Sequence, residues 1–168
     1  MKAKQLQMRI RFVLLFFMIA LLFSGLTAFP IGWELGILVQ LVTPLKNIAP
    51  ALFDWVSLVN RGIQETYTQY PFVAYGTDWL AFAHIVIALA FIGPLRDPVK
   101  NIWIVEWGML ACMLIVPLAV IMNPIRGIPF FWTLVDCSFG VLGIIPLWIA
   151  RGDILQISKE EHPLEEIK

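Results

Sequence analysis

Four long apolar stretches constrain this chain more than any other feature of its sequence. They cover residues 12–29, 72–95, 102–122 and 128–150, and few charged side chains interrupt them. A helix needs roughly 20 mainly apolar residues to cross the hydrocarbon core of a bilayer. With 60% hydrophobic and 14% charged residues, the chain does not suit a soluble globular fold. We therefore predict an all-α, polytopic membrane protein, a single membrane domain (1–168) whose four transmembrane helices form one bundle.

The first apolar stretch, residues 12–29, has the start of a secretory signal peptide. However, its apolar core is longer than the roughly 7–15 residues of a typical cleaved signal, and Leu-Thr-Ala at 26–28 is a poor cleavage site. We therefore expect this stretch to be retained as the first span. The basic residues that precede it are Lys2, Lys4, Arg9 and Arg11.

The segment between the first two spans, residues 31–70, predicts a helical insertion on the membrane surface. Pro30 breaks the first helix, and the apolar run 31–43 is too short to cross a bilayer unaided, so it is either peripheral or re-entrant. Residues 51–70 show apolar side chains at helical spacing, which indicates an amphipathic helix whose apolar face lies on lipid headgroups or caps the bundle. The residues of that face are Leu52, Trp55, Val56, Val59, Ile63 and Tyr67.

The distribution of Lys and Arg beside the spans predicts the orientation, because positively charged loops are retained in the cytoplasm. Nine of the twelve basic residues fall on one side, and only Lys46, Arg61 and Arg126 fall on the other. Both termini are therefore expected in the cytoplasm, together with a charged, exposed tail (154–168), and the insertion outside. Tryptophans near the span ends agree with this arrangement. We expect a plasma membrane, the inner membrane of a bacterium.

Four ionisable side chains lie within the predicted spans: Asp78, His84, Glu106 and Asp136. Such a residue costs about 2.5–3.5 kcal/mol near the membrane centre, so it usually faces the bundle and has a partner or a function. These four are our predicted ligand-binding residues. If the second and fourth spans touch, Asp136 would orient the His84 imidazole and create a proton acceptor or a polar anchor. The alternative is an interhelical hydrogen bond worth about 1 kcal/mol that only fixes packing.

Asp78 and Glu106 also allow structural interpretations. Asp78 would serve as an interfacial cap or meet Arg126, and Glu106 would form an ion pair with Arg96 or Arg151 near the cytoplasmic surface.

Small residues in the fourth span indicate tight helix packing. Gly140 and Gly143 permit close backbone approach, either to another helix of this chain or to a second copy. Cys112 and Cys137 both lie in predicted spans, where we expect small buried side chains rather than a disulfide.

Several function classes lack their sequence signatures. No metal-binding motif, phosphate-binding loop or nucleophile elbow occurs, and a net charge of zero gives no reason to expect nucleic acid. We predict no cofactor: a bis-histidine haem site through His84 would need a second intramembrane histidine, and His162 belongs to the tail, so haem would require a dimer or a methionine ligand. Ion carriers usually show repeated broken helices and more intramembrane charge.

Two functions remain. The first is non-enzymatic: a subunit, an assembly factor or a binder of an apolar ligand, with membrane lipids and either a membrane-protein partner or a second copy as partners. A ligand would place its polar head near His84 and Asp136. Its tail would lie among Phe82, Phe91, Met109, Met113 and Phe139.

The second function is an intramembrane enzyme acting on a lipid or isoprenoid, in which His84 and Asp136 exchange protons. Four spans, a capping outer segment and buried acids resemble in layout the sterol-isomerase and sigma-2-receptor group. That resemblance is architectural and does not by itself carry function, so no residue role is carried over from it.

Overall fold

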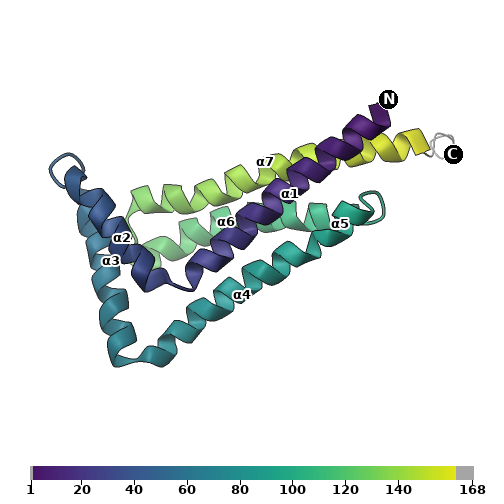
Figure 1. Cartoon of the computed structure of the whole chain (residues 1–168). Coiled ribbons are helices and arrows are strands. Elements are labelled where there is room, and N and C mark those ends of the chain that lie inside the picture. The colour runs from purple at the N-terminus through teal and green to yellow at the C-terminus, as the bar shows by residue number, and fades with distance from the viewer. Residues whose placement is uncertain (1, 162–168) are drawn as a thin grey trace. The chain divides into compact units, whose positions relative to one another are not determined.

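The computed structural model describes residues 2–161, and every regular element within that range is helical (Figure 1). Four helical segments are long and apolar enough to cross a membrane, which confirms the all-α class and the four expected helices. These segments are Lys4–Ala28, Pro71–Arg96, Ile102–Ile125 and Phe130–Glu160. The elements in chain order are α1 (Lys2–Ala28), α2 (Ile31–Val42), η1 (Thr43–Leu45), α3 (Pro50–Gln69), η2 (Pro71–Val73), α4 (Ala74–Ala90), α5 (Ile92–Arg96), α6 (Ile102–Ile125) and α7 (Phe130–Glu161).

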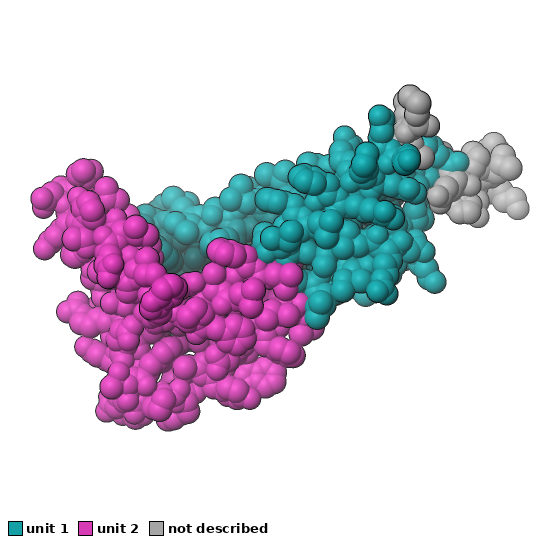
Figure 2. Space-filling view, in the orientation of Figure 1, with its two compact units in different colours: residues 1–20, 88–168 teal, residues 21–87 magenta. Residues whose placement is uncertain are grey.

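The chain divides into two compact units, coloured separately in Figure 2. The first unit combines residues 1–20 with 88–168, and the second comprises residues 21–87. Each unit is described by itself below. The single bundle expected from the sequence remains a prediction.

The first unit is built on the close contact of α6 with α7. At Gly140 the two helices approach so closely that an added Cβ would lie 2.5 Å from the backbone oxygen of Cys112. Gly108 of α6 leaves room for the ring of Phe91, which is fully buried and lies 4.9 Å, centroid to centroid, from Phe17. The tight packing predicted for the fourth span is therefore confirmed, and its partner is a helix of the same chain.

The turn between α6 and α7 depends on Gly127, the one residue with positive φ (+69°) in the part of the chain described. The amide of Gly127 donates to the carbonyl of Pro124 (3.2 Å), and the amide of Ile128 donates to that of Asn123 (2.9 Å). This pair of bonds is a Schellman motif, which satisfies the last carbonyls of a helix. The predicted third span ends at residue 122, but the helix continues to Ile125 because this cap lies further on.

Helix α7 continues well past the predicted end of the fourth span at residue 150. It runs through Asp153 as far as Glu161, and Ile154 and Ile157 are almost completely buried (0% and 2% exposed). The expectation of an exposed tail is therefore wrong for Ile154 and Ile157, whereas Leu155, Gln156, Lys159 and Glu160 are exposed as expected. The rest of the predicted tail, residues 162–168, lies outside the described residues.

The predicted second span is interrupted rather than continuous. Helix α4 ends at Ala90, and α5 begins at Ile92. Pro94 has no backbone N–H and its ring crowds the preceding turn, which accounts for the break.

In the second unit α2 and α3 pack against each other as a helical hairpin (Figure 1). Pro30 ends α1 as predicted, and its carbonyl accepts hydrogen bonds from the amides of Trp33 (2.9 Å) and Glu34 (3.0 Å), which start α2. The amide group of Gln64 on α3 donates to the carbonyl of Gly32 (2.7 Å) and ties the two helices together. The amphipathic helix expected at 51–70 is confirmed as α3.

Candidate functional site

A buried polar cluster lies where α6 ends and α7 begins. The side-chain amide of Asn123 donates hydrogen bonds to Asp136 Oδ2 (2.6 Å) and to Thr133 Oγ1 (3.2 Å). Asn123 and Thr133 are buried, and Asp136 is half-buried. Both N–H groups of the Asn123 amide are thus used, so the cluster presents hydrogen-bond acceptors to its surroundings.

An apolar groove opens beside this cluster. Its volume is about 420 Å³, within the range of roughly 300–1,000 Å³ found for small-molecule sites. Among the lining residues Thr133 alone has a polar side chain. The groove therefore has apolar walls and reaches the polar cluster of Asn123, Thr133 and Asp136 at Thr133. The lining residues are Val120, Pro124, Ile128, Phe130 and Thr133.

A second polar feature joins α1 to α7. Arg9 Nε donates to Asp153 Oδ2 (2.6 Å), and Arg9 Nη2 contacts Asp153 Oδ1, so the pair is bidentate. The Asp153 side chain is only 5% exposed, whereas that of Arg9 is 59% exposed.

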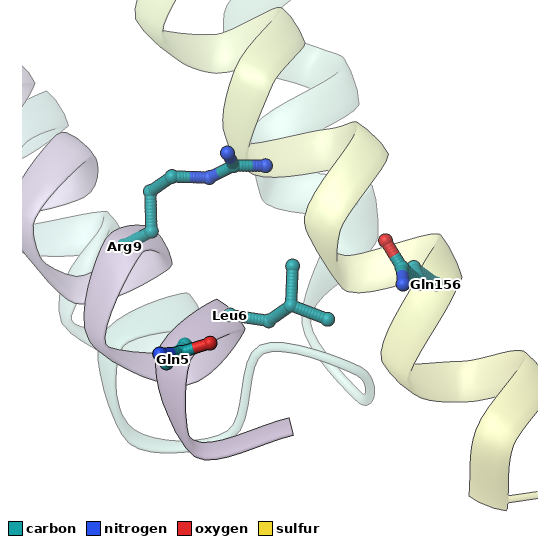
Figure 3. A pocket seen from close by; sticks show the side chains of 4 residues that line it. All are labelled: Gln5, Leu6, Arg9 and Gln156. Carbon is teal, nitrogen blue, oxygen red and sulfur yellow. The ribbon is translucent and has the colours of Figure 1, made fainter. Parts of the chain in front are cut away.

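Beside this ion pair lies a pocket of about 310 Å³, lined by Gln5, Leu6, Arg9 and Gln156. Figure 3 shows the Arg9 side chain reaching from α1 across to α7. Because Asp153 already neutralises the guanidinium, the pocket has little positive charge for an anionic ligand. We therefore assign the pair a structural role.

Glu106 takes part in an ion pair, as its structural interpretation predicted. Arg151 Nε donates to Glu106 Oε1 at 2.8 Å, and both side chains are nearly half exposed (42% and 45%).

His84 belongs to the second unit, in which it donates from Nδ1 to the carbonyl of Leu80 one turn earlier (2.8 Å). Gly25 of α1 lies against it: an added Cβ at Gly25 would lie 2.9 Å from His84 Cβ and 2.9 Å from the Ala81 carbonyl oxygen. Asp136 belongs to the first unit and bonds Asn123. The two residues thus have separate local partners, and their predicted meeting remains a prediction.

Asp78 lies half-buried near the start of α4. Its neighbour Thr77 makes a hydroxyl contact with Tyr67 of α3 (3.1 Å). The capping role proposed for Asp78 remains a prediction.

Phe91, which was expected to line a ligand tail, is instead part of the core of the first unit.

Residues 2–161 contain no group of three or more His, Cys, Asp or Glu side chains placed to hold a metal ion. Cys112 is buried and Cys137 half-buried, and both are free thiols.

Asn123 is not among the site residues predicted from the sequence, because it lies just past the predicted end of the third span at residue 122. A usable signal was present, because a short turn between antiparallel helices brings residues on either side of it close together. Asn123, four residues before Gly127, and Thr133, six residues after it, meet across this turn. The partner of Asp153 gave no such local signal, since Arg9 lies 144 positions away in the chain.

Comparisons with protein-family models, with curated proteins and with solved structures find no match for this chain. The function is therefore argued from the chemistry of the site alone.

Proposed function

We propose that this chain is an integral membrane protein that binds a lipid-like amphiphile in the groove between α6 and α7, without catalysis. One observation carries the proposal: an apolar groove ends on Thr133, which shares the Asn123 amide with the Asp136 carboxylate. Ligand sites typically combine apolar walls with a few polar groups that fix the orientation of the ligand.

The hydrogen-bonding capacity of the cluster selects the polar end of the ligand. Both N–H donors of the Asn123 amide bond Thr133 and Asp136. The Asp136 carboxylate and the Thr133 hydroxyl oxygen therefore remain as acceptors for a ligand. A hydroxyl or an amine fits these acceptors, whereas a phosphate meets the negative charge of Asp136.

The proposed orientation follows the distribution of basic residues and places both termini in the cytoplasm. The turn at Gly127, and with it the groove, then faces the outer leaflet of a bacterial plasma membrane. A lipid would enter from that leaflet, and a protein partner or a second copy would bind elsewhere on the bundle.

Photo-crosslinking tests the groove directly. The purified chain in lipid vesicles is exposed to a diazirine-bearing long-chain alcohol, and labelled peptides are quantified by mass spectrometry. Val120→Trp fills the groove and should reduce labelling around Ile128 several-fold. Val141→Trp is the matched control, because Val120 and Val141 are equally exposed (55%) but only Val120 lines the groove. Equal labelling of both variants would contradict the proposal.

A lipid-modifying enzyme remains the second proposal, supported by the geometry of His84. Because Nδ1 carries the hydrogen that bonds Leu80, Nε2 of the neutral ring has a free lone pair and is a proton acceptor. His84→Gln in a folded chain should then change the lipid composition of cells that depend on this protein. An unchanged lipid profile favours the binding function.

A further inference from the structure

Helix α2 presents an apolar stripe that no other helix of its unit covers. Trp33, Ile37 and Leu41 are 70%, 37% and 67% exposed. Their spacing of four places them on one face of the helix. The two polar side chains of α2, Glu34 and Gln40, lie at the edges of this face, one on each side.

The remaining surfaces of the hairpin differ sharply from this stripe. Val42 of α2 and Val56 of α3 are buried where the two helices pack together. The exposed side of α3 carries charges, including Asp54, Arg61 and Glu65. The hairpin therefore has one apolar side, formed by α2, and one charged side, formed by α3.

Exposed apolar side chains also lie on either side of α2 in the sequence. Phe23 and Leu26 near the end of α1 are 69% and 56% exposed, and Phe29 in the turn is 46% exposed. Beyond α2, Leu45 (39%) and Ile48 (80%) are exposed as well, with the exposed Lys46 and Asn47 between them. Exposed apolar side chains that follow a proposed span directly into a short helix favour lipid as the occupant, because the lipid around the span is already adjacent.

We infer that α2 lies in the boundary between headgroups and acyl chains of the membrane, with its Trp33 stripe in lipid and α3 on the water side. Twelve residues are too few to cross the bilayer, and interfacial helices bury one apolar face while the other contacts water or protein. Trp33 follows the end of α1 by five residues, and tryptophan rings prefer the membrane–water interface next to span ends. The sequence offered both the run 31–43 and the helix 51–70 for the membrane surface; α3 packs against α2, which leaves the α2 stripe for this contact.

This inference rests on the proposed membrane insertion of the chain, so the experiment includes a position that tests insertion alone. Nitroxide labels are attached through Trp33→Cys, Leu41→Cys, Asp54→Cys, Glu65→Cys and Phe23→Cys, each in a background of Cys112→Ala and Cys137→Ala. The full chain is reconstituted into vesicles of phosphatidylcholine and phosphatidylglycerol. Power saturation then measures collisions with oxygen, which concentrates in lipid, and with a water-soluble nickel complex.

We expect oxygen collisions to exceed nickel collisions several-fold at the Trp33 and Leu41 positions, as at the Phe23 position, and the reverse at Asp54 and Glu65. Dominant nickel access at Trp33 and Leu41, with Phe23 in lipid, would overturn the inference but leave the proposed span intact. Low access to both reagents at Trp33 and Leu41 would show a protein partner or a second copy on the stripe and would also overturn it. Dominant nickel access at Phe23 would overturn both the inference and the membrane insertion on which it rests.

Discussion

The two members of the Arg9–Asp153 pair differ in exposure, and this difference predicts unequal effects of removing them. Arg9→Ala leaves the buried Asp153 carboxylate without its guanidinium, whereas Asp153→Asn leaves an exposed arginine that water solvates. We expect Arg9→Ala to lower the midpoint of thermal unfolding in detergent about twice as much as Asp153→Asn. Arg9→Ala combined with Asp153→Leu should recover most of the loss. Equal effects of the two single variants would show that Asp153 is solvated.

The exposed pair Glu106–Arg151 is the control for that comparison. Both partners are nearly half exposed, and exposed ion pairs contribute up to about 1 kcal/mol. Glu106→Gln should therefore shift the unfolding midpoint only slightly. A shift as large as that of Arg9→Ala would mean that ion pairing in general, rather than burial of a carboxylate, explains the loss.

Asn123 donates two hydrogen bonds to residues of α7. Its replacement should therefore lower the free energy of unfolding more than removal of a side chain that bonds only its own helix. Asn123→Leu removes the donors to Thr133 and Asp136, and a buried acceptor left unpaired costs about 1–3 kcal/mol. Ser138→Ala is the control, because the Ser138 hydroxyl bonds the Val135 carbonyl of the same helix (2.6 Å). Chemical denaturation in detergent measures both variants. Comparable losses would show that the cluster adds little to stability.

At the scale of helices, two glycines of α7 should respond oppositely to the same substitution. Gly140→Ala would place a Cβ 2.5 Å from the Cys112 carbonyl oxygen, so α6 and α7 must separate, at a cost of roughly 1–3 kcal/mol. Gly152 has open space around its Cα, so Gly152→Ala should stabilise the helix by about 0.5–1 kcal/mol. Thermal unfolding compares the two. Stabilisation by both would contradict the close approach of α6 to α7.

The positions of the four long helices were predictable, because the length and apolar composition of each stretch are visible in the sequence. Several helix ends were not predictable. The predicted fourth span ended at residue 150, before Arg151, Gly152 and Asp153, because charged side chains are costly within a membrane. Helix α7 continues because Arg9 neutralises that carboxylate and Ile154 and Ile157 pack in the core. Both causes depend on residues distant in sequence. The candidate site shows the same difference between local and distant information. Asp136 was predicted because an ionisable side chain within a span is unusual, whereas its partner Asn123 is recognised only once the turn between α6 and α7 is known.

For the whole molecule, α6 gives the most direct test of membrane crossing. Its 24 residues measure about 36 Å at 1.5 Å per residue, slightly more than the roughly 30 Å hydrocarbon core. Lys100 and Arg126 lie just beyond its two ends, and both are exposed. If α6 spans the bilayer, these two residues must lie on opposite sides of it. The excess of Lys and Arg further predicts which side each occupies, with Lys100 in the cytoplasm.

A membrane-impermeant maleimide distinguishes these positions. In a background of Cys112→Ala and Cys137→Ala, Arg126→Cys should react in intact cells, whereas Lys100→Cys should react only after the cells are permeabilised. Asp54→Cys on the charged side of α3 should behave like Arg126→Cys, because the insertion is expected outside. The reverse pattern would show that the basic residues mark the outer face and that the groove opens toward the cytoplasm. If Lys100→Cys and Arg126→Cys react alike in intact cells, α6 does not cross the membrane, and the proposal of a lipid site within a membrane-spanning helix pair loses its premise.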